Sequence, residues 1–408
     1  MCYLVEMATY TKASQERGEA NMKFVHLSDL HLGKRLKDYS LLEDQRIILE
    51  QIIGIVEKEK PQAVVIAGDI YDTAVPTVDA VELCDYFLTK LHECNVPVLV
   101  IAGNHDNAKR IAFGAGLLQS SDVYMSPVYN GKMNCVTIQD EYGPVHFYLM
   151  PFLRRSEIQY YHPEVEVRTY TEAIRTVVEA AGVNWTERNV VVSHQFVVGG
   201  QVSDGSGATF CLADEDRIGD VDRVERQAYN GFEYVALGHL HTPQHVGVPT
   251  VRYCGTPLKY SLSELWSNKS VTVVEMSAKG DEVQLRTIPL VPKHDARELK
   301  GTLQDLLDPE YDKGDHSDYI SVVLTDEQDQ FDAISYLRRL YPNILSVKPE
   351  KESQYAACAR AIAEVKELAP ADVFAKFYNE VVGKEMTAEQ TQLIADILEE
   401  IQTQNNAQ

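Results

Sequence analysis

The sequence of 408 residues predicts an α/β protein: a two-sheet α/β sandwich, then a small α+β unit, then C-terminal helices. Three observations predict this order. Short β-rich runs alternate with amphipathic helices up to about Pro289, mixed helix and strand signals follow Val291, and only helix signals remain after about Glu350. The expected divisions of the chain are therefore 1–21, 22–289, 290–350 and 351–408.

The first elements form a βαβαβ pattern. The β-rich runs are Lys23–Leu27, Ala63–Ala67 and Val96–Ala102, each bounded by polar or glycine turns. Leu41–Lys60 carries apolar residues at helical spacing and is stopped by Pro61, and Asp79–Cys94 repeats this pattern. Because crossovers between parallel strands are right-handed, these strands are expected to lie parallel in one sheet.

Later segments complete the sandwich and build the small α+β unit. The further strands expected in the sandwich are Val145–Met150, Val190–Val192, Tyr234–Leu237, Val251–Tyr253 and Val271–Glu275. The expected elements of the α+β unit are a helix at Arg297–Leu307, a strand at Tyr319–Leu324, a helix at Phe331–Leu340 and a strand at Ile344–Lys348.

The C-terminal segment carries two amphipathic helix patterns. The first has an apolar stripe that includes Phe374 and Phe377, and the second begins at Thr387, where Gln390 completes a capping box. Such helices either pack on their own domain or dock a partner through the apolar face. Both possibilities stay open at this point.

Composition limits the classes of function. The net charge of −23 argues against nucleic-acid binding over the whole surface, but not against a local basic groove. The seven cysteines are scattered without a CxxC pair, which indicates reduced thiols and a cytoplasmic protein. We see no membrane span, no signal-peptide core and no P-loop for ATP. Residues 1–21 are expected to be a disordered extension or the result of a start codon assigned too far upstream.

Five polar clusters follow directly after predicted strands. In an open α/β sheet, loops at the carboxyl ends of strands meet at one crevice, so these clusters can share a site although they span more than half of the chain. They are Asp29-Leu-His31, Gly68-Asp69 with Asp72, Gly103-Asn104-His105-Asp106, His194, and Gly238-His239-Leu-His241.

The residue types in these clusters predict a centre for two divalent metal ions. Asp, Asn and His offer oxygen and imidazole ligands without thiolates, which suits Mn²⁺, Fe²⁺ or Mg²⁺. Asp69 is the expected bridge between ions roughly 3.5–4 Å apart, and water held between them is the expected nucleophile for phosphoryl chemistry. The expected ligands are Asp29, His31 and His241 for one ion, and Asn104, His194 and His239 for the other.

His105 and Asp106 are the expected catalytic pair. His105 lies next to a ligand and is needed by neither ion, so it could stabilise charge on a phosphate and protonate the leaving oxygen. Asp106 would then orient the His105 imidazole and keep it cationic.

Each cluster alone has an ordinary structural explanation. A strand followed by Gly-Asp or Gly-Asn is common turn chemistry, and a single histidine such as His194 is often a hydrogen-bonded core residue. Five such clusters in this order, each at a strand end, make coincidence a poor explanation. The motifs leave three functions open: a DNA nuclease, a phosphomonoesterase or nucleotide hydrolase, and a non-catalytic adaptor for an ATPase.

The ordered motifs resemble the calcineurin-like metallophosphoesterase superfamily, whose fold is a two-sheet sandwich. The residues flanking them resemble the SbcD family of bacterial nuclease subunits. The stretches that carry this second resemblance are Asp29–Gly33 with Leu42–Gln45, Gly103–Gly114, Ala236–Gln244 and Gly255–Ser261.

Membership of that family would imply several properties. These are Mn²⁺-dependent double-strand exonuclease activity and endonuclease activity on hairpins and DNA ends, in DNA repair, recombination and replication. They also include a homodimer that binds an SbcC-type coiled-coil ATPase through the C-terminal helices, as a heterotetramer at the nucleoid. The α+β unit would be a capping domain that shapes DNA access. Archaeal and eukaryotic relatives carry a histidine where this chain has Asp72, so capping or hydrogen bonding is the better expectation for Asp72.

Basic residues beside two ligand loops are candidate DNA contacts. Lys34 and Arg35 follow the first loop, and Lys109 and Arg110 follow the third. They could neutralise phosphates next to the metal ions, or they could form an ordinary solvated basic face.

Overall fold

The computed structural model describes residues 8–10, 21–198, 223–326 and 332–350, with residues 374, 378, 386–387 and 390–394 beyond them. The chain divides into two compact units, Met1–Arg297 and Glu298–Gln408. The domain boundary that the sequence predicts between residues 289 and 290 stays a prediction.

The first sheet contains the predicted parallel strands. Its order is β17-β16-β2-β5-β6-β7, and β2, β5, β6 and β7 run parallel, which confirms the βαβαβ prediction. Antiparallel β16 and β17 extend the sheet beyond β2. The strands are β2 (Met22–Leu27), β5 (Ala63–Ala67), β6 (Val98–Ile101), β7 (Val123–Met125), β16 (Ser270–Met276) and β17 (Gln284–Pro289).

Two helices, α1 (Leu42–Glu59) and α2 (Val78–Glu93), are the crossovers of this sheet. Both begin and end within one residue of the predicted bounds. Lys60 takes a left-handed conformation after α1, directly before Pro61, and the Thr77 side chain accepts a hydrogen bond from the Ala80 N–H at the start of α2. The apolar residues of α1 that recur at helical spacing are buried, among them Leu49, Ile52 and Val56.

The second sheet has the order β1-β8-β9-β10-β13-β15-β14, in which β9, β10, β13 and β15 are parallel. The strands are β1 (Ala8–Tyr10), β8 (Asn134–Asp140), β9 (Gly143–Met150), β10 (Arg188–Ser193), β13 (Tyr234–Leu237), β15 (Val248–Tyr253) and β14 (Gln244–Val246). Strand β1 pairs with β8, and the rest of 1–20 lies outside the described residues, so the expectation for 1–21 stays a prediction.

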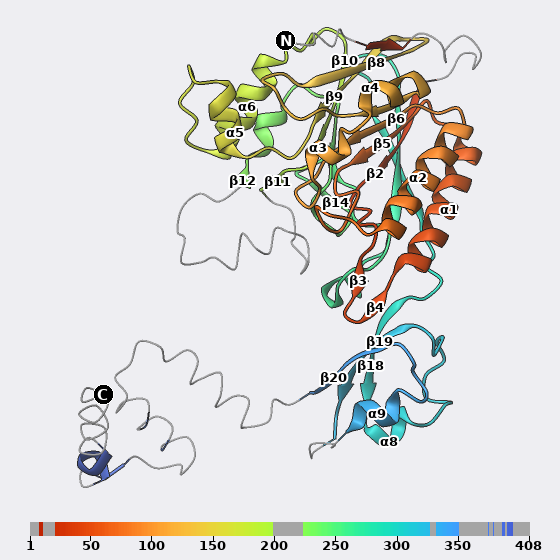
Figure 1. The fold of residues 1–408 in the computed structure, drawn as a ribbon, viewed down its shortest axis with the longest axis vertical. Coiled ribbons are helices and arrows are strands. Elements are labelled where there is room, and N and C mark those ends of the chain that lie inside the picture. Colours follow the sequence, from red (N-terminus) through yellow and green to blue (C-terminus); the bar gives the residue numbers. More distant parts are fainter. Residues whose placement is uncertain are drawn as a thin grey trace. The chain divides into compact units, whose positions relative to one another are not determined.

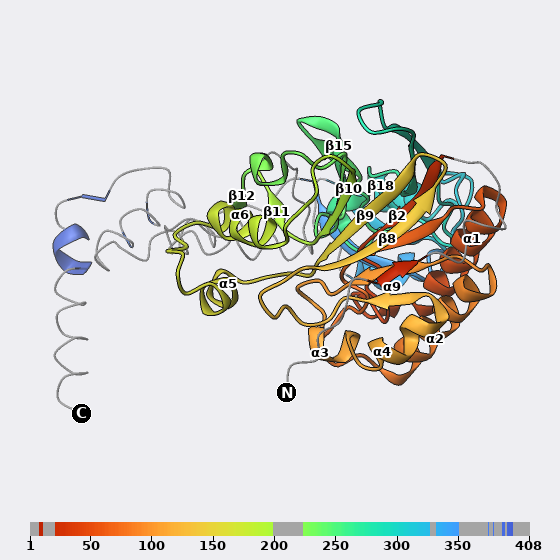
Figure 2. The same ribbon diagram turned by 90° about the horizontal axis from the view of Figure 1, so that it is seen from above.

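The first unit is a sandwich of these two sheets. Helices α1 and α2 lie side by side on the outer face of the first sheet, and α5 (Arg155–Tyr161) and α6 (Tyr170–Ala180) lie on the far side of the second (Figures 1 and 2). Between the sheets Phe24 packs edge-on against Phe147 and Tyr234, with ring centroids 5.3 and 5.6 Å apart. This core holds the carboxyl ends of both sets of parallel strands at one edge.

Short elements connect the main layers. They are β3 (Arg35–Leu36), β4 (Tyr39–Ser40), α3 (Ala108–Ile111), α4 (Ala115–Leu118), η1 (Gln119–Ser121), β11 (Phe196–Val197), β12 (Arg223–Val224), η2 (Arg226–Tyr229) and η3 (Leu262–Glu264). No described helix has the length and apolarity that a membrane crossing needs.

The second unit contains a three-stranded sheet in the order β18-β19-β20. Its elements are β18 (Ala296–Gly301), α8 (Leu303–Leu306), β19 (Tyr319–Leu324), α9 (Ala333–Leu337) and β20 (Ile344–Pro349). The helix predicted at Arg297–Leu307 is wrong over its first half, which is strand β18. Its helix-favouring side chains are overridden because this segment pairs with β19, and Thr302 caps the short helix α8 that follows.

Most of the C-terminal segment 351–408 lies outside the described residues. The capping box predicted at Thr387 is present. The Thr387 N–H donates to Gln390 Oε1 at 2.9 Å, and the Gln390 N–H donates to Thr387 Oγ1 at 3.3 Å. The partner-docking role of this segment stays a prediction.

Candidate metal centre

The five predicted clusters meet at the shared edge of the two sheets. Three of them follow β2, β5 and β6 of the first sheet, and two follow β10 and β13 of the second. Backbone hydrogen bonds tie the loops together: the Asp29 N–H donates to Gly68 O at 3.0 Å, and the His31 N–H donates to Asp69 O at 2.9 Å. All five clusters therefore lie at strand ends, as the sequence predicts.

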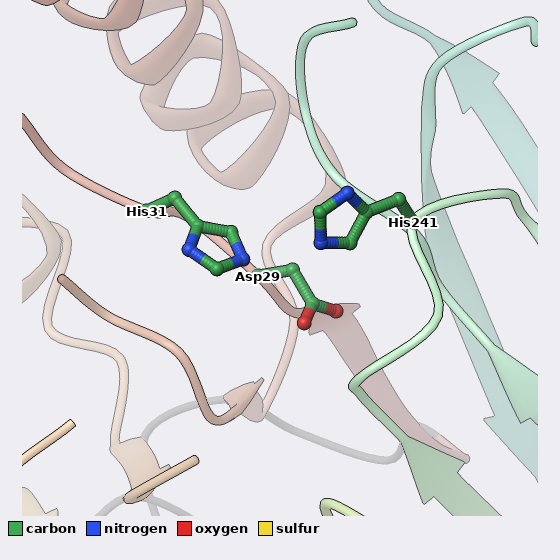
Figure 3. Close-up of side chains that lie close together, drawn as sticks. All are labelled: Asp29, His31 and His241. Carbon is green, nitrogen blue, oxygen red and sulfur yellow. The ribbon is translucent and has the colours of Figure 1, made fainter. Parts of the chain in front are cut away.

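Asp29, His31 and His241 form the first predicted ligand group. Their ligand atoms all lie within 4.8 Å of one another, and all three side chains are buried. Figure 3 shows them converging on one space, Asp29 and His31 from the segment after β2 and His241 from a loop of the other sheet. Three ring nitrogens of this group have no hydrogen-bond partner among the described residues: both nitrogens of His31, and Nε2 of His241. Buried polar atoms of this kind are usually satisfied by a bound water or ion, and the acidic neighbour Asp29 favours a cation here.

Asn104, His194 and His239 form the second group. The Asn104 Oδ1 atom lies 3.1 Å from His194 Nε2 and 2.9 Å from His239 Nδ1. The Nδ1–H of His194 donates to Ala67 O at 2.7 Å, which orients the ring so that Nε2 faces the other ligands.

Asp69 lies between the two groups, as a bridging ligand must. Its Oδ2 atom is 3.6 Å from His31 Nε2 and 3.2 Å from His194 Nε2. Asp29 also approaches the second group, because its Oδ1 atom is 3.9 Å from His194 Nε2. The Asp29 carboxylate therefore lies beside both groups, and its assignment to one ion stays a prediction.

Glycines permit this close approach. A Cβ atom on Gly68 would lie 2.4 Å from His194 Nδ1, and one on Gly103 would lie 2.1 Å from Asp69 Oδ1. The ligands themselves also accept backbone strain, because Asp29, His31, Asp69 and His239 all have positive φ. Strain of this kind is retained where the surrounding structure holds a functional geometry.

The charges of the site are arranged around His194 and Asp69. Burial lowers the pKa of His194, but the carboxylates of Asp69 and Asp29 outweigh it and raise that pKa to about 9. Burial would raise the pKa of Asp69, and the charge of His194 instead holds it well below its usual range. Burial, followed by the charge of His194, lowers the pKa of His239 to about 3. The metal-free protein thus keeps a cationic imidazole among the carboxylates.

His105 lies at the edge of this site, half-buried. Its Nδ1–H donates to the backbone carbonyl of Asp72 at 2.9 Å, its backbone N–H donates to Asp69 Oδ1 at 2.9 Å, and its ring centroid is 4.8 Å from that of His31. The bond to the carbonyl assigns the proton to Nδ1 and leaves Nε2 for a substrate oxygen.

Asp106 does not have the role predicted for it. Its carboxylate accepts backbone N–H bonds from Ile70 at 3.0 Å, Tyr71 at 3.0 Å and Gly103 at 2.9 Å. Burial, followed by the charge of Asp69, raises the pKa of Asp106 to about 6. It joins the second and third ligand loops, and the orientation of His105 comes from the Asp72 carbonyl instead. Spacing alone did not reveal which group the carboxylate faces.

Comparisons with known proteins show the family to which this chain belongs. The calcineurin-like phosphoesterase family model matches residues 22–243, and the model of the type 5 capsule protein repressor C-terminal domain matches residues 292–382. The SbcD subunit of nuclease SbcCD from Staphylococcus saprophyticus is 30% identical over 380 residues, covering 92% of this chain and 98% of that protein. The chain belongs to the calcineurin-like phosphoesterases and, among them, to the SbcD family.

A second SbcD relative is consistent with this membership. The SbcD subunit of nuclease SbcCD from Staphylococcus epidermidis is 31% identical to this SbcD-family chain over 332 residues, covering 80% of the chain and 85% of that protein. The solved structure of a dimetal phosphatase from Danio rerio is 14% identical, with a TM-score of 0.38, and covers 66% of this chain and 97% of that one.

The ligands of this SbcD-family chain fit divalent metal ions. The donor set is carboxylate, amide and imidazole, and three buried imidazole nitrogens in the first group have no protein partner among the described residues. The chain is a metal-dependent hydrolase. The residues that could hold divalent ions are Asp29, His31, Asp69, Asn104, His194, His239 and His241.

The predicted DNA contacts differ in their surroundings. The Lys34 Nζ atom is 2.8 Å from Asp72 Oδ1, and the Arg35 guanidinium donates to the Asp38 carbonyl. Lys109 and Arg110 are exposed on α3, where Asn107 caps their backbone N–H groups. Asp72 is thus a hydrogen-bond partner of Lys34, in agreement with the expectation made from sequence, and its Oδ1 atom lies 3.6 Å from His31 Nδ1.

Several residues that support the site were missed from sequence. The Gln45 amide donates to His31 O at 2.8 Å, and the Tyr260 hydroxyl donates to Leu30 O at 2.6 Å. Glu264 and Lys269 are buried beside His241. Gln45 and Tyr260 fall inside the stretches that resemble the SbcD family, which was the available signal for them. Glu264 and Lys269 lie outside those stretches.

Proposed function

We propose that this protein is the nuclease subunit of an SbcCD-type complex and hydrolyses phosphodiester bonds in DNA with two divalent metal ions, most favourably Mn²⁺. One observation carries the proposal. All seven predicted ligands surround one site, with Asp69 between the two groups and His105 at the edge where a phosphate would enter. The names of the relatives, which describe nuclease subunits, support DNA as the substrate.

The chain's own residues have distinct tasks in this proposal. When bound, the two ions supply positive charge to the phosphate and acidify water at the site. His105, held through Nδ1 by the Asp72 carbonyl, would in its doubly protonated form direct Nε2–H towards a phosphate oxygen, pass that proton to the leaving oxygen and become neutral. Asp106 would keep the loops of Asp69 and His105 in register through its three backbone hydrogen bonds.

The finer properties of the family belong to the same proposal. They are exonuclease activity on double-stranded DNA and endonuclease activity on hairpins and ends, with roles in repair, recombination and replication. We propose a homodimer bound to an SbcC-type ATPase through 351–408, working on DNA in the cytoplasm. Lys109 and Arg110, exposed directly after the third ligand loop, are the proposed phosphate contacts, with Lys34 and Arg35 after the first.

A comparison of two substrates tests the proposed activity. The protein with Mn²⁺ is given a labelled DNA hairpin or a chromogenic phosphate monoester, with and without an SbcC-type partner. We expect cleavage of the hairpin. Turnover of the monoester alone would reject the nuclease and favour a phosphomonoesterase, and binding of the partner without hydrolysis of either substrate would favour an adaptor.

Replacing the proposed acid tests the role of His105. His105→Gln is expected to bind Mn²⁺ like the wild type and to cleave about 10²–10⁴-fold more slowly. His245→Gln is the matched control, because His245 is exposed on β14 and takes no part in the proposed site. Wild-type cleavage by His105→Gln would refute the acid role.

A further inference from the structure

A buried pair of opposite charges lies beside the metal centre, and the proposed chemistry does not use it. Glu264 ends η3 and has no exposed surface, and Lys269 directly precedes β16 and is 6% exposed. Burying two charges is costly unless each finds several hydrogen bonds. The hydrogen bonds of this pair therefore indicate its role in the protein.

Both carboxylate oxygens of Glu264 have partners. Oε1 lies 3.0 Å from His241 Nδ1 and accepts from the Ser261 hydroxyl at 3.0 Å. Oε2 accepts from Lys269 Nζ at 2.5 Å. Lys269 also donates to the His241 carbonyl oxygen at 2.8 Å and to Thr256 Oγ1 at 2.7 Å. The pair thus holds His241 twice, once by the ring and once by the backbone.

The ring contact determines which nitrogen of His241 carries the proton. A carboxylate only accepts hydrogen bonds, so the hydrogen lies on Nδ1 and the lone pair on Nε2. That Nε2 atom is buried without a partner among the described residues, and His241 belongs to the same ligand group as Asp29 and His31 (Figure 3).

We propose that Glu264 and Lys269 are positioning residues that fix the ring orientation and tautomer of His241 for a divalent metal ion. The inference rests on the proposed two-metal function and deepens it. A carboxylate that orients a ligand histidine is a general device of metal sites. Lys269 offsets the charge of Glu264, so the clamp orients His241 without adding net charge to a site that already contains Asp29 and Asp69.

Two double variants isolate the ring contact. Glu264→Gln with Lys269→Met removes both charges and keeps an oxygen that can accept from His241 Nδ1. Glu264→Leu with Lys269→Met removes both charges and also the acceptor. Mn²⁺ affinity is measured by calorimetry without DNA, and thermal unfolding is followed in EDTA. We expect the Leu form to bind one of the two ions about 10–100-fold more weakly than the Gln form, at similar unfolding temperatures.

A second carboxylate–histidine pair gives the control. Glu187 accepts from His146 Nε2 at 2.6 Å, and neither residue belongs to a metal-ligand group. Glu187→Leu is expected to leave Mn²⁺ affinity unchanged. Equal Mn²⁺ affinity of the two folded double variants would overturn the inference. If the two variants differ in Mn²⁺ affinity but the wild-type protein does not cleave the hairpin, only the proposed substrate is rejected.

A measurement on the wild type covers the case in which a double variant does not fold. Nitrogen NMR of the histidines in the metal-free protein reports the tautomer of each ring, and the His241 signals are assigned by their loss in His241→Asn. We expect the proton of His241 on Nδ1. A proton on Nε2 alone would refute the role of Glu264.

Discussion

Gly103 offers the sharpest perturbation of the metal centre. It directly precedes Asn104 and packs against the proposed bridging ligand. A Cβ atom at this position would lie 2.1 Å from Asp69 Oδ1 and 2.4 Å from the Asp69 backbone nitrogen. Because one of the two contacts is backbone, a rotation of the Asp69 side chain relieves only part of the overlap. Gly103→Ala must therefore separate the second and third ligand loops.

The size of the required movement follows from these distances. Ordinary van der Waals contact begins at 3.4 Å, so the 2.1 Å gap between the added Cβ and Asp69 Oδ1 must open by about 1.3 Å. Metal and catalytic groups tolerate displacements of only about 0.5 Å, and a catalytic group misplaced by 1 Å costs about 10²-fold in reaction rate. We expect Gly103→Ala to lose at least about 100-fold in Mn²⁺ affinity and about 1–3 kcal/mol of unfolding free energy through overpacking.

Calorimetric titration with Mn²⁺ and urea unfolding of the metal-free protein measure both effects. Gly54→Ala is the matched control, because Gly54 lies within α1 and a Cβ atom there meets nothing within 4 Å. That change should stabilise the protein by up to about 1 kcal/mol and leave metal affinity unaltered. A folded Gly103→Ala protein with wild-type Mn²⁺ affinity would refute the reasoning.

Three further predictions test other parts of the molecule. Lys109→Gln with Arg110→Gln should weaken DNA binding and reduce the slope of log affinity against log salt by about 0.9 for each phosphate that is no longer neutralised. The control variant Lys58→Gln with Lys60→Gln, roughly 20 Å along α1 from Gln45, should change neither the affinity nor the slope. An unchanged slope in the first variant would remove both residues from the DNA footprint. Asp106→Ala should lower the unfolding free energy by about 3 kcal/mol in urea titrations and weaken Mn²⁺ binding, because three backbone N–H groups lose their acceptor; equal stability of Asp106→Ala and His105→Gln would contradict the clamping role of Asp106. Burial lowers the pKa of His26 to about 3, below its ordinary 6.5. The stability linked to this shift is therefore present above pH 6.5 and is lost on acidification towards pH 3, by at most about 1.4 kcal/mol per pH unit. In urea titrations between pH 7 and 5, the unfolding free energy should decline less steeply for His26→Gln than for the wild type, and identical pH slopes would refute the assignment.

The candidate metal ligands could be predicted from sequence because their positions follow a simple rule. Each ligand cluster lies directly after a buried parallel strand, and parallel strands end at one edge of the sheet. The apolar runs that mark those strands, such as Ala63–Ala67, are local properties of the chain. The residue types then limited the chemistry to oxygen and imidazole ligation of divalent ions.

Other features depended on contacts that are distant in sequence. The segment Ala296–Gly301 contains helix-favouring residues and became a strand because it pairs with β19. Asp106 was assigned to its neighbour His105, but its carboxylate reaches back to Ile70 and Tyr71. Local spacing shows which residues are close along the chain, and side-chain directions in loops depend on the packing of the whole site.

The sequence by itself determined the sandwich, the order of the polar clusters and the choice of seven candidate ligands, because these follow from hydrophobic periodicity, strand ends and residue type. Only the tertiary structure decided how the ligands are held. It brought Glu264 and Lys269 to His241, turned Asp106 towards the backbone of the neighbouring loop, and placed the Asp29 carboxylate beside both ligand groups. The physical reason is that a buried charge or polar atom must find its partners wherever the fold brings them, at whatever separation along the chain.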